Sequence, residues 1–229
     1  MEKIKVIGFD ADDTLWINEP YYQEVEIKLQ TLLENFLPAE KISGELFRTE
    51  MSNLHIYGYG AKSFMLSMIE TALKIGGNDL SPNIINEIIL LGKSLLEKPV
   101  ELLDNVKELL PELKDKYSII VATKGDLVDQ QRKLNNSGLV DHFDHIEIMK
   151  DKQEKDYIDL IRKLNIKNEE FLMIGNSLMS DVLPVVSIGG KAIHIPYHTT
   201  WIHEIADKNS ITKDYIEISK LSELKDILL

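Results

Sequence analysis

The stretch KIKVIGFDADDTLW, residues 3–16, decides the fold because a largely apolar run ends abruptly in carboxylates. Residues 4–9 show little alternation between apolar and polar positions, which is typical of a parallel-sheet strand that is covered on both faces. Asp10, Asp12 and Asp13 follow at once. Neighbouring carboxylates repel and raise one another's pKa unless a cation or a row of backbone N–H groups lies among them. The stretch therefore predicts a buried strand whose carboxyl end binds a ligand.

The composition limits the class of protein and of partner. The chain has 229 residues, of which 44% are hydrophobic and 28% charged, as in ordinary globular proteins. Its net charge of −12 disfavours broad contact with nucleic acid or with an anionic membrane, so a small ligand suits it better. The absence of cysteine excludes disulfides and thiolate chemistry. With no pattern of a signal peptide or membrane span, we expect a cytoplasmic protein, monomeric or homodimeric.

The central part of the chain is predicted to be helical. Between Pro20 and Lys98, apolar residues recur at helical spacing and no strand pattern occurs. Ser81-Pro82 is typical of a helix start, with serine as the cap and proline in the first turn. Breaks at Leu37-Pro38 and Gly76-Gly77 indicate about four helices. The expected apolar faces contain Tyr22, Val25, Leu29, Leu32 and Leu33, and then Phe64, Met65, Met68, Ile69, Ala72 and Leu73.

After Pro99, predicted helices alternate with predicted strands, which is typical of a parallel α/β sheet. We therefore predict a Rossmann-like α/β core formed by residues 1–16 and 99–229, with a helical domain inserted at residues 17–98. The expected strands after the insertion are 117–123, 143–149, 170–175 and 191–196, and the expected helices are 104–116, 126–138 and 157–164.

Polar residues gather at the predicted strand ends, where open α/β sheets bind their ligands. Besides the first stretch, the sequence Thr123-Lys124-Gly125 ends one strand and Gly175-Asn176-Ser177 ends another, with Asp181 shortly after. The stretch KDKQEK, residues 150–155, adds three lysines between them. Carboxylates, a hydroxyl group, an amide and an ammonium group are thus expected at one edge of the sheet.

These residue types suit phosphoryl transfer. A carboxylate can attack phosphorus and form an aspartyl phosphate, and a second carboxylate can act on the leaving group. Hard oxygen ligands suit Mg²⁺, which neutralises charge on the transferred group. Thr123 and the backbone N–H that follows it can hold phosphate oxygens, and a lysine can supply the remaining positive charge.

The motifs and their order resemble those of the haloacid dehalogenase-like hydrolase superfamily, in its phosphatase branch with a helical cap after the first motif. DADDT resembles the first motif, which implies that Asp10 is the nucleophile and Asp12 the general acid and base. IIVAT resembles the second motif and implies a catalytic role for Thr123. GNSLMSD, residues 175–181, resembles the fourth. For the third motif, Lys150, Lys152 and Lys155 are candidates, and Lys152 best fits the spacing to the helix that follows.

The resemblance implies a Mg²⁺-dependent phosphatase that hydrolyses small phosphorylated metabolites through an aspartyl phosphate. The implied metal ligands are Asp10, Asp12, Asn176 and Asp181, although Asn176 stands where the family usually has aspartate. A phosphomutase of the same superfamily needs the same aspartates and stays as an alternative, and a non-catalytic phosphate-binding module is a more distant one. A dehalogenase is disfavoured by the second aspartate.

Several residues have two interpretations on sequence alone. Tyr59 and Lys62, in the stretch YGYGAKSF, either bind substrate as part of a cap loop or only connect two helices. Lys124 is expected to bind substrate through its backbone N–H. Asp13 is expected to cap the turn after the first strand. Trp16 either lies at a hinge or contacts substrate.

The three histidines of HIPYHTTWIH, residues 194–203, do not have the spacing of a zinc site. We expect them in a loop beside the active site.

Overall fold

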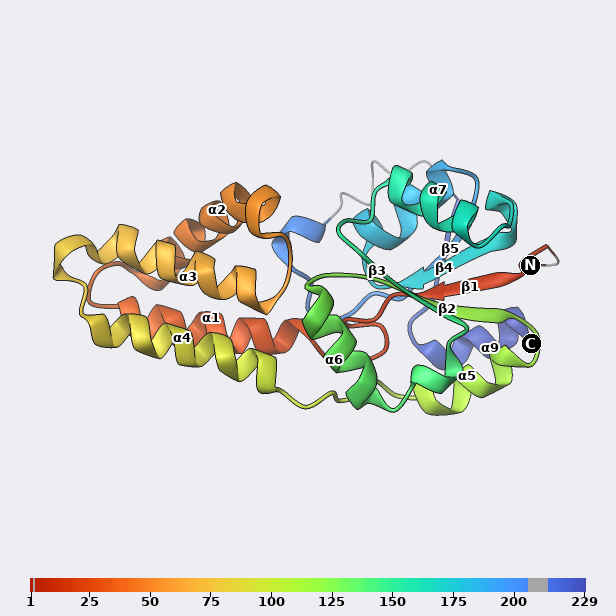
Figure 1. Cartoon of the computed structure of the whole chain (residues 1–229), viewed down its shortest axis with the longest axis horizontal. Helices are drawn as coiled ribbons and strands as arrows, with labels where there is room; N and C mark the ends of the chain where they lie inside the picture. Colours follow the sequence, from red (N-terminus) through yellow and green to blue (C-terminus); the bar gives the residue numbers. More distant parts are fainter. Residues whose placement is uncertain (2, 206–213) are drawn as a thin grey trace. The chain divides into compact units, whose positions relative to one another are not determined.

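The computed structural model describes residues 1, 3–205 and 214–229. The chain divides into two compact units, one built on a sheet and one built of helices (Figure 1). We call them the core unit and the helical unit. The core unit comprises Met1–Glu19, Val100–Lys124 and Gln130–Leu229, and the helical unit comprises Pro20–Pro99 and Gly125–Asp129.

The core unit contains a parallel sheet with the strand order β3-β2-β1-β4-β5-β6, as the predicted α/β fold requires. β1 lies at its centre between β2 and β4, so the carboxyl end of β1 is flanked by the ends of both neighbours. The sixth strand was not predicted. It is two residues long and exposed, which is too short for a periodic pattern. The strands are β1 Val6–Phe9, β2 Ser118–Lys124, β3 His145–Met149, β4 Phe171–Gly175, β5 Lys191–His194 and β6 Ile216–Glu217.

Helices cover both faces of the sheet (Figure 1). Side chains alternate between the faces along each strand: Ile7 and Phe9 pack with α5, α6 and α9, whereas Val6 packs on the other side with α7 and α8. Both faces are apolar, which explains why β1 reads as a nearly continuous hydrophobic run. The helices are α5 Val106–Lys114, α6 Leu127–Ser137, α7 Glu154–Lys163, α8 Leu183–Ser187 and α9 Leu224–Leu228.

The helical unit has its own apolar core, formed by the predicted helix faces. Ser81 caps α4 as predicted, because its hydroxyl accepts a hydrogen bond from the backbone N–H of Asn83. One predicted core residue was wrong: Leu73 is 52% exposed, since it lies at the edge of the apolar face of its helix. The helices are α1 Glu19–Leu33, α2 Ala39–Tyr57, α3 Ala61–Gly76 and α4 Pro82–Glu97. No helix in the described residues combines the length and the apolar character needed to cross a membrane.

Candidate active site

The ammonium group of Lys152 joins two carboxylates at the carboxyl edge of the sheet. Asp10 follows the last residue of β1, and its Oδ1 accepts a hydrogen bond from Lys152 Nζ. The same ammonium group donates to Asp181 Oδ1 at 2.7 Å. Lys152 and Asp181 are 1% and 0% exposed. A buried charge is tolerated only with partners of opposite charge, so the three residues form one interdependent cluster.

Burial and pairing act in opposite directions in this cluster. Burial raises the pKa of Asp10 to about 7, and the Lys152 ammonium counters that rise. For Lys152, burial alone would lower the pKa, but the charges of Asp10 and Asp181 outweigh burial and hold its pKa well above the usual value. Lys152 therefore stays an ammonium group near neutral pH and favours the ionised form of Asp10.

A π-helical turn, Leu178–Val182, brings Asp181 back to the end of β4. The backbone N–H of Ser177 donates to Asp181 Oδ2 at 3.0 Å, and the Ser177 hydroxyl accepts from the backbone N–H of Ser180 at 3.1 Å. Tyr157 on α7 secures the turn, since its hydroxyl donates to the Ser180 carbonyl at 2.9 Å. Turns of this kind are rare and often occur at functional sites. Both carboxylate oxygens of Asp181 are thus held by hydrogen bonds within the core unit.

Asn176 lies beside two oxygen acceptors. One of the two terminal positions of its amide lies 3.3 Å from the Asp12 backbone carbonyl oxygen and 3.3 Å from Asp10 Oδ2. If the amide nitrogen occupies this position, it donates hydrogen bonds to both acceptors. If the amide oxygen occupies it, that oxygen lies together with the Asp12 carbonyl oxygen and Asp10 Oδ2, so three oxygens converge. Converging oxygens are the donor set that Mg²⁺ prefers, so these residues fit the ion. In the described residues no cluster of three or more His, Cys, Asp or Glu side chains suits a metal ion.

The side chain of Asp12 turns to donors different from those of Asp10. Its Oδ1 accepts hydrogen bonds from Trp16 Nε1 and from Lys133 Nζ, each at 2.6 Å. Its Oδ2 accepts from Gln130 Nε2 at 2.7 Å. The backbone carbonyl of Asp12 therefore lies on the side of Asp10 and Asn176. Its carboxylate is held instead by Trp16 and by two side chains of α6.

Thr123 lies near the end of β2, one strand away from Asp10. It is buried, at 1% exposure. The side chain of Lys124 turns elsewhere: its Nζ forms an ion pair with Glu204 and a hydrogen bond of 2.8 Å to Ser180 Oγ. The backbone of Lys124 at the strand end is the part that suits the predicted contact with substrate.

The structure separates the three candidate lysines of the third motif. Lys150 and Lys155 are exposed, whereas Lys152 is buried against Asp10. The predicted substrate residues Tyr59 and Lys62 belong to the helical unit, where Lys62 Nζ pairs with Asp126 Oδ1 at 2.9 Å. Tyr59 lies in the short link between α2 and α3.

Two polar residues near the site have structural partners. Asp13 caps the turn as predicted, since its carboxylate accepts hydrogen bonds from the backbone N–H groups of Asn18 and Glu19. His194 ends β5 and is buried, in agreement with the predicted strand 191–196, so the expectation that it lies in a loop was wrong. Its Nε2 lies 2.9 Å from the backbone carbonyl of Asn176, so it supports the candidate metal residue.

Gln130 and Lys133 lie at the site although they were not predicted from the sequence. They are three positions apart on the predicted helix 126–138 and therefore share one face of it. Polar residues on a helix face usually indicate solvent, but these two are 3% and 8% exposed. The i, i+3 spacing was a signal in the sequence, although it did not show which face of the helix is buried.

Comparison with known proteins supports the same family. A family model described as haloacid dehalogenase-like hydrolase matches residues 4–189. Glyceraldehyde 3-phosphate phosphatase of Pyrococcus furiosus is 25% identical over 244 residues, covering 100% of this chain and 94% of the relative. The 5-amino-6-(5-phospho-D-ribitylamino)uracil phosphatase YigB of Escherichia coli is 22% identical, covering 99% of this chain and 97% of the relative.

Solved structures show the same fold. A haloacid dehalogenase-like family hydrolase from Xanthomonas campestris superimposes with a TM-score of 0.82 and 38% identity, over 90% of this chain and 86% of that chain. YfnB of Bacillus subtilis, in a crystal structure bound to magnesium, has a TM-score of 0.67 and 19% identity, over 99% of both chains. With the family model matching most of its length and the motif residues meeting at one edge of the sheet, this chain belongs to the haloacid dehalogenase-like hydrolases.

Proposed function

We propose that the protein is a Mg²⁺-dependent phosphatase that hydrolyses small phosphorylated molecules through an aspartyl phosphate on Asp10. The observation that carries the proposal is the buried Lys152, whose ammonium group joins Asp10 to Asp181 at the carboxyl edge of the sheet. The two curated relatives described above are both named as phosphatases of small phosphorylated compounds. A negatively charged protein needs such a local positive group to bind phosphate.

In the first step, a carboxylate oxygen of Asp10 attacks phosphorus, and the bond from phosphorus to the leaving oxygen breaks. Asp12 donates a proton to that oxygen, so the alcohol leaves neutral. In the second step, Asp12 accepts a proton from water as the water attacks phosphorus, which releases phosphate and regenerates Asp10. Lys152 and the residues at Thr123 and Lys124 hold the phosphate oxygens during both steps.

We assign Mg²⁺ to the oxygens of Asp10, the Asp12 carbonyl and Asn176, which lie close together. When bound there, the ion neutralises charge on the transferred phosphoryl group. The family resemblance also implies that Asp181 is a metal ligand. Because Lys152 and the Ser177 N–H occupy both of its carboxylate oxygens, we propose that Asp181 mainly holds Lys152 in place. The magnesium-bound relative YfnB has the same fold, which is consistent with this assignment.

We propose further that the helical unit acts as a cap that selects the substrate, with Tyr59 and Lys62 as contact residues. Their segment carries two glycines with positive φ, Gly58 at 71° and Gly60 at 104°, so the link between α2 and α3 adopts a conformation that other residues rarely reach.

A cytoplasmic location also stays a prediction from the sequence.

The test is phosphate release from a panel of phosphate esters, with Mg²⁺ and with EDTA, by the wild-type protein and by Asp10→Asn. We expect Mg²⁺-dependent release from the wild type and none from the variant. Acid quenching followed by mass spectrometry should find phosphate on Asp10 in the wild type. Transfer of phosphate to a sugar phosphate without release would instead identify a phosphomutase, and binding without turnover would identify a phosphate-binding module.

A further inference from the structure

The carboxylate of Asp12 is held by two buried side chains that belong to none of the motifs. Gln130 and Lys133 extend from α6, and together they contact both oxygens of Asp12 at 2.7 and 2.6 Å. The indole of Trp16 adds a third donor at 2.6 Å. All of these residues belong to the core unit.

We propose that Lys133 and Gln130 are positioning residues that orient the Asp12 carboxylate for proton transfer to the leaving group. The inference rests on the proposed phosphatase function and extends it. The terminal torsion of an aspartate side chain has broad minima, so the backbone alone does not set the plane of its carboxylate. Donors at both oxygens do set it.

Burial supports a dedicated role for both residues. Lys133 is 8% exposed, and an ammonium group is removed from water only at a cost that its partners must offset. Its partners are Asp12 and Asn18, whose side-chain oxygen lies 3.1 Å from Lys133 Nζ. The ammonium group therefore ties the catalytic loop to α6.

The amide of Gln130 is oriented by the carboxylate. Its Nε2 donates to Asp12 Oδ2 and also to the Lys124 backbone carbonyl at 3.1 Å. Its own carbonyl oxygen is buried and has no hydrogen-bond partner among the described residues. A buried oxygen without a hydrogen-bond partner destabilises the folded state. The amide thus leaves its oxygen unsatisfied while its nitrogen links Asp12 to the end of β2.

Positioning of this kind has a specific kinetic consequence. Leaving-group protonation matters for an alkyl alcohol, which is a poor leaving group, and matters little for nitrophenol, which leaves as a stable anion. The value of kcat/KM reports only the steps up to the first irreversible one, the transfer of phosphate to Asp10. A misplaced Asp12 should therefore lower kcat/KM for alkyl phosphates and spare nitrophenyl phosphate.

The experiment measures kcat/KM of Lys133→Met and Gln130→Met on a series of esters that differ in the leaving group. Correct placement of an acid contributes about 10²–10⁴ in rate, so we expect a loss of roughly 10–100-fold on alkyl phosphates. On nitrophenyl phosphate we expect a change of less than about threefold, because little protonation is needed there. Thermal unfolding of each variant checks that it is folded. If Lys133→Met does not fold, Gln130→Met alone carries the test.

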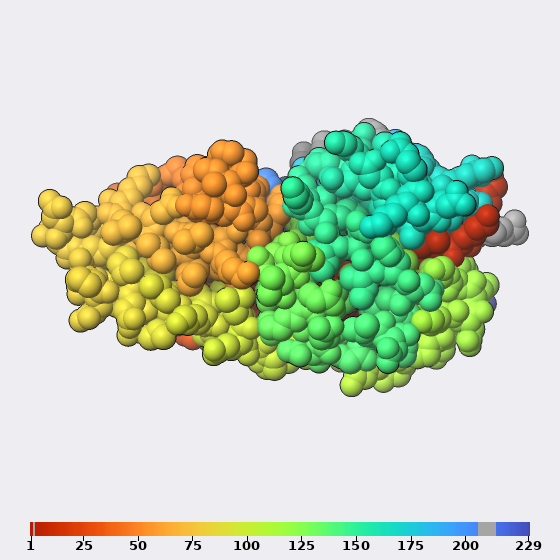
Figure 2. All heavy atoms as spheres, viewed as in Figure 1, coloured from red at the N-terminus to blue at the C-terminus, as the bar shows by residue number. Residues whose placement is uncertain are grey.

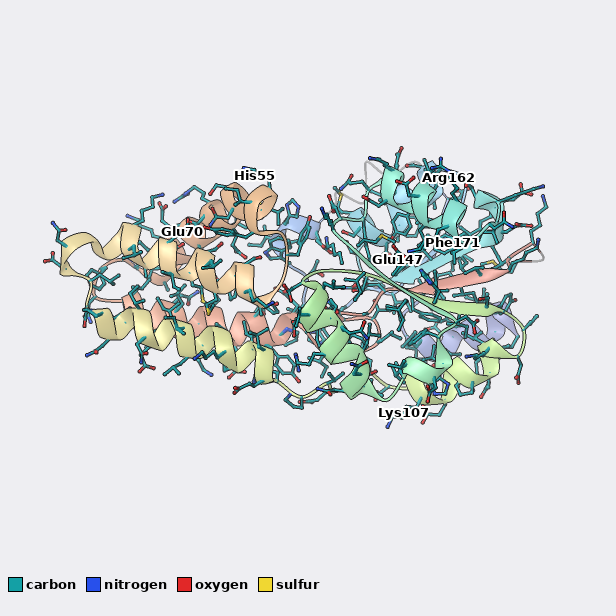
Figure 3. The ribbon with its side chains drawn as sticks, in the orientation of Figure 1. His55, Glu70, Lys107, Glu147, Arg162 and Phe171 are labelled. Atoms are coloured by element: carbon teal, nitrogen blue, oxygen red, sulfur yellow. The ribbon has the colours of Figure 1, made fainter. Side chains whose placement is uncertain are left out.

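Two controls match these variants. Gln131→Met lies on the exposed side of the same helix, where Gln131 Nε2 donates a hydrogen bond to Asn135 Oδ1 at 3.1 Å. Lys107→Met removes an exposed lysine that points away from α5 (Figure 3). Neither control should change kcat/KM for any ester. In the Asp12→Asn background, Lys133→Met should cause no further loss, because residues that act through one another are not additive.

The possible results separate the two proposals. If the wild type hydrolyses esters but Lys133→Met and Gln130→Met lower kcat/KM equally for every leaving group, the positioning role is overturned and the phosphatase function stands. Full additivity with Asp12→Asn would also overturn it. A wild-type protein that hydrolyses no ester would overturn the proposed function and, with it, the role of both residues.

Discussion

Gly175 lies so close to Asp181 that a β-carbon on Gly175 would be 2.2 Å from Asp181 Oδ2. No side chain fits at that distance, so any residue other than glycine would displace the carboxylate that accepts a hydrogen bond from Lys152. The glycine at the start of GNSLMSD is therefore required by close packing.

Gly175→Ala should push Asp181 out of place and abolish most of the phosphatase activity. Overpacking of this kind typically costs about 1–3 kcal/mol in the free energy of unfolding, which chemical denaturation measures. Gly44→Ala is the matched control, because its nearest neighbour would be 3.9 Å away and the residue lies inside α2. It should stabilise the protein by roughly 0.5–1 kcal/mol. Native activity in Gly175→Ala would contradict the packing argument.

Lys152→Met should abolish activity, since it removes the ammonium group that joins Asp10 and Asp181. Two carboxylates would then share a buried site without a partner, and breaking a buried ion pair in this way costs about 3–5 kcal/mol. Lys150→Met and Lys155→Met are the controls, because both lysines are exposed. They should keep native activity and stability in phosphate-release and denaturation assays. If Lys150→Met or Lys155→Met is the inactive variant, Lys152 is not the motif lysine.

Asn176→Asp should lower the Mg²⁺ concentration needed for half-maximal activity, and Asn176→Ala should raise it. An aspartate keeps an oxygen in the same position and adds a charge that Mg²⁺ favours, whereas alanine removes the oxygen. The measurement is a Mg²⁺ titration of ester hydrolysis by the three proteins. Equal half-saturation in all three would remove Asn176 from the metal site.

Glu50 on α2 should make the helical unit less stable as the pH rises. Burial, with a smaller contribution from the charge of Glu26, raises the pKa of Glu50 from 4.5 to about 8. Between these pH values the folded state binds a proton that the unfolded state has lost, so stability falls by up to about 1.4 kcal/mol per pH unit. Thermal unfolding between pH 5 and 8 checks this, because that range lies between the ordinary pKa of 4.5 and the raised pKa of about 8.

Glu50→Gln supplies the matched comparison for this pH effect. A neutral amide of similar shape should flatten the fall in Tm and raise Tm near pH 8, where wild-type Glu50 begins to ionise. Glu40→Gln, at an exposed position of the same helix, should follow the wild-type curve. The same pH dependence in Glu50→Gln and in the wild type would exclude Glu50 as its source.

Lys62→Ala and Tyr59→Phe should change the selectivity among substrates more than the rate on a minimal phosphate ester. Remote contacts act through parts of the substrate that a minimal ester lacks. Lys62→Ala also removes the ion pair with Asp126, which is partly exposed and stabilises by at most about 1 kcal/mol. The measurement compares kcat/KM across the ester panel. A uniform change for every ester would show that the segment only connects α2 and α3.

The helices α5 and α6 form part of the outer surface in the space-filling view (Figure 2). The sequence predicted α6 as a helix at residues 126–138, within one residue of the observed helix at each end. It did not show that Gln130 and Lys133 lie on the buried side. A polar helix face has the same sequence pattern whether water or a carboxylate covers it.

The sequence by itself determined the parallel sheet and the position of Asp10, Thr123 and Asn176 at its ends. Buried strands read as continuous apolar runs, and parallel strands bring their carboxyl ends to one edge, so the pattern along the chain is sufficient for both. The family resemblance rests on the same short segments.

Only the tertiary structure decided how the side chains at that edge pair. Asp10 and Asp12 are two residues apart, yet Lys152 contacts one and Lys133 the other. Lys152 follows β3, and Lys133 lies on α6. The turn after β4 likewise determines that Asp181 reaches Lys152. Such pairings depend on distances between segments far apart in the chain, which chain packing sets and which local sequence patterns do not encode.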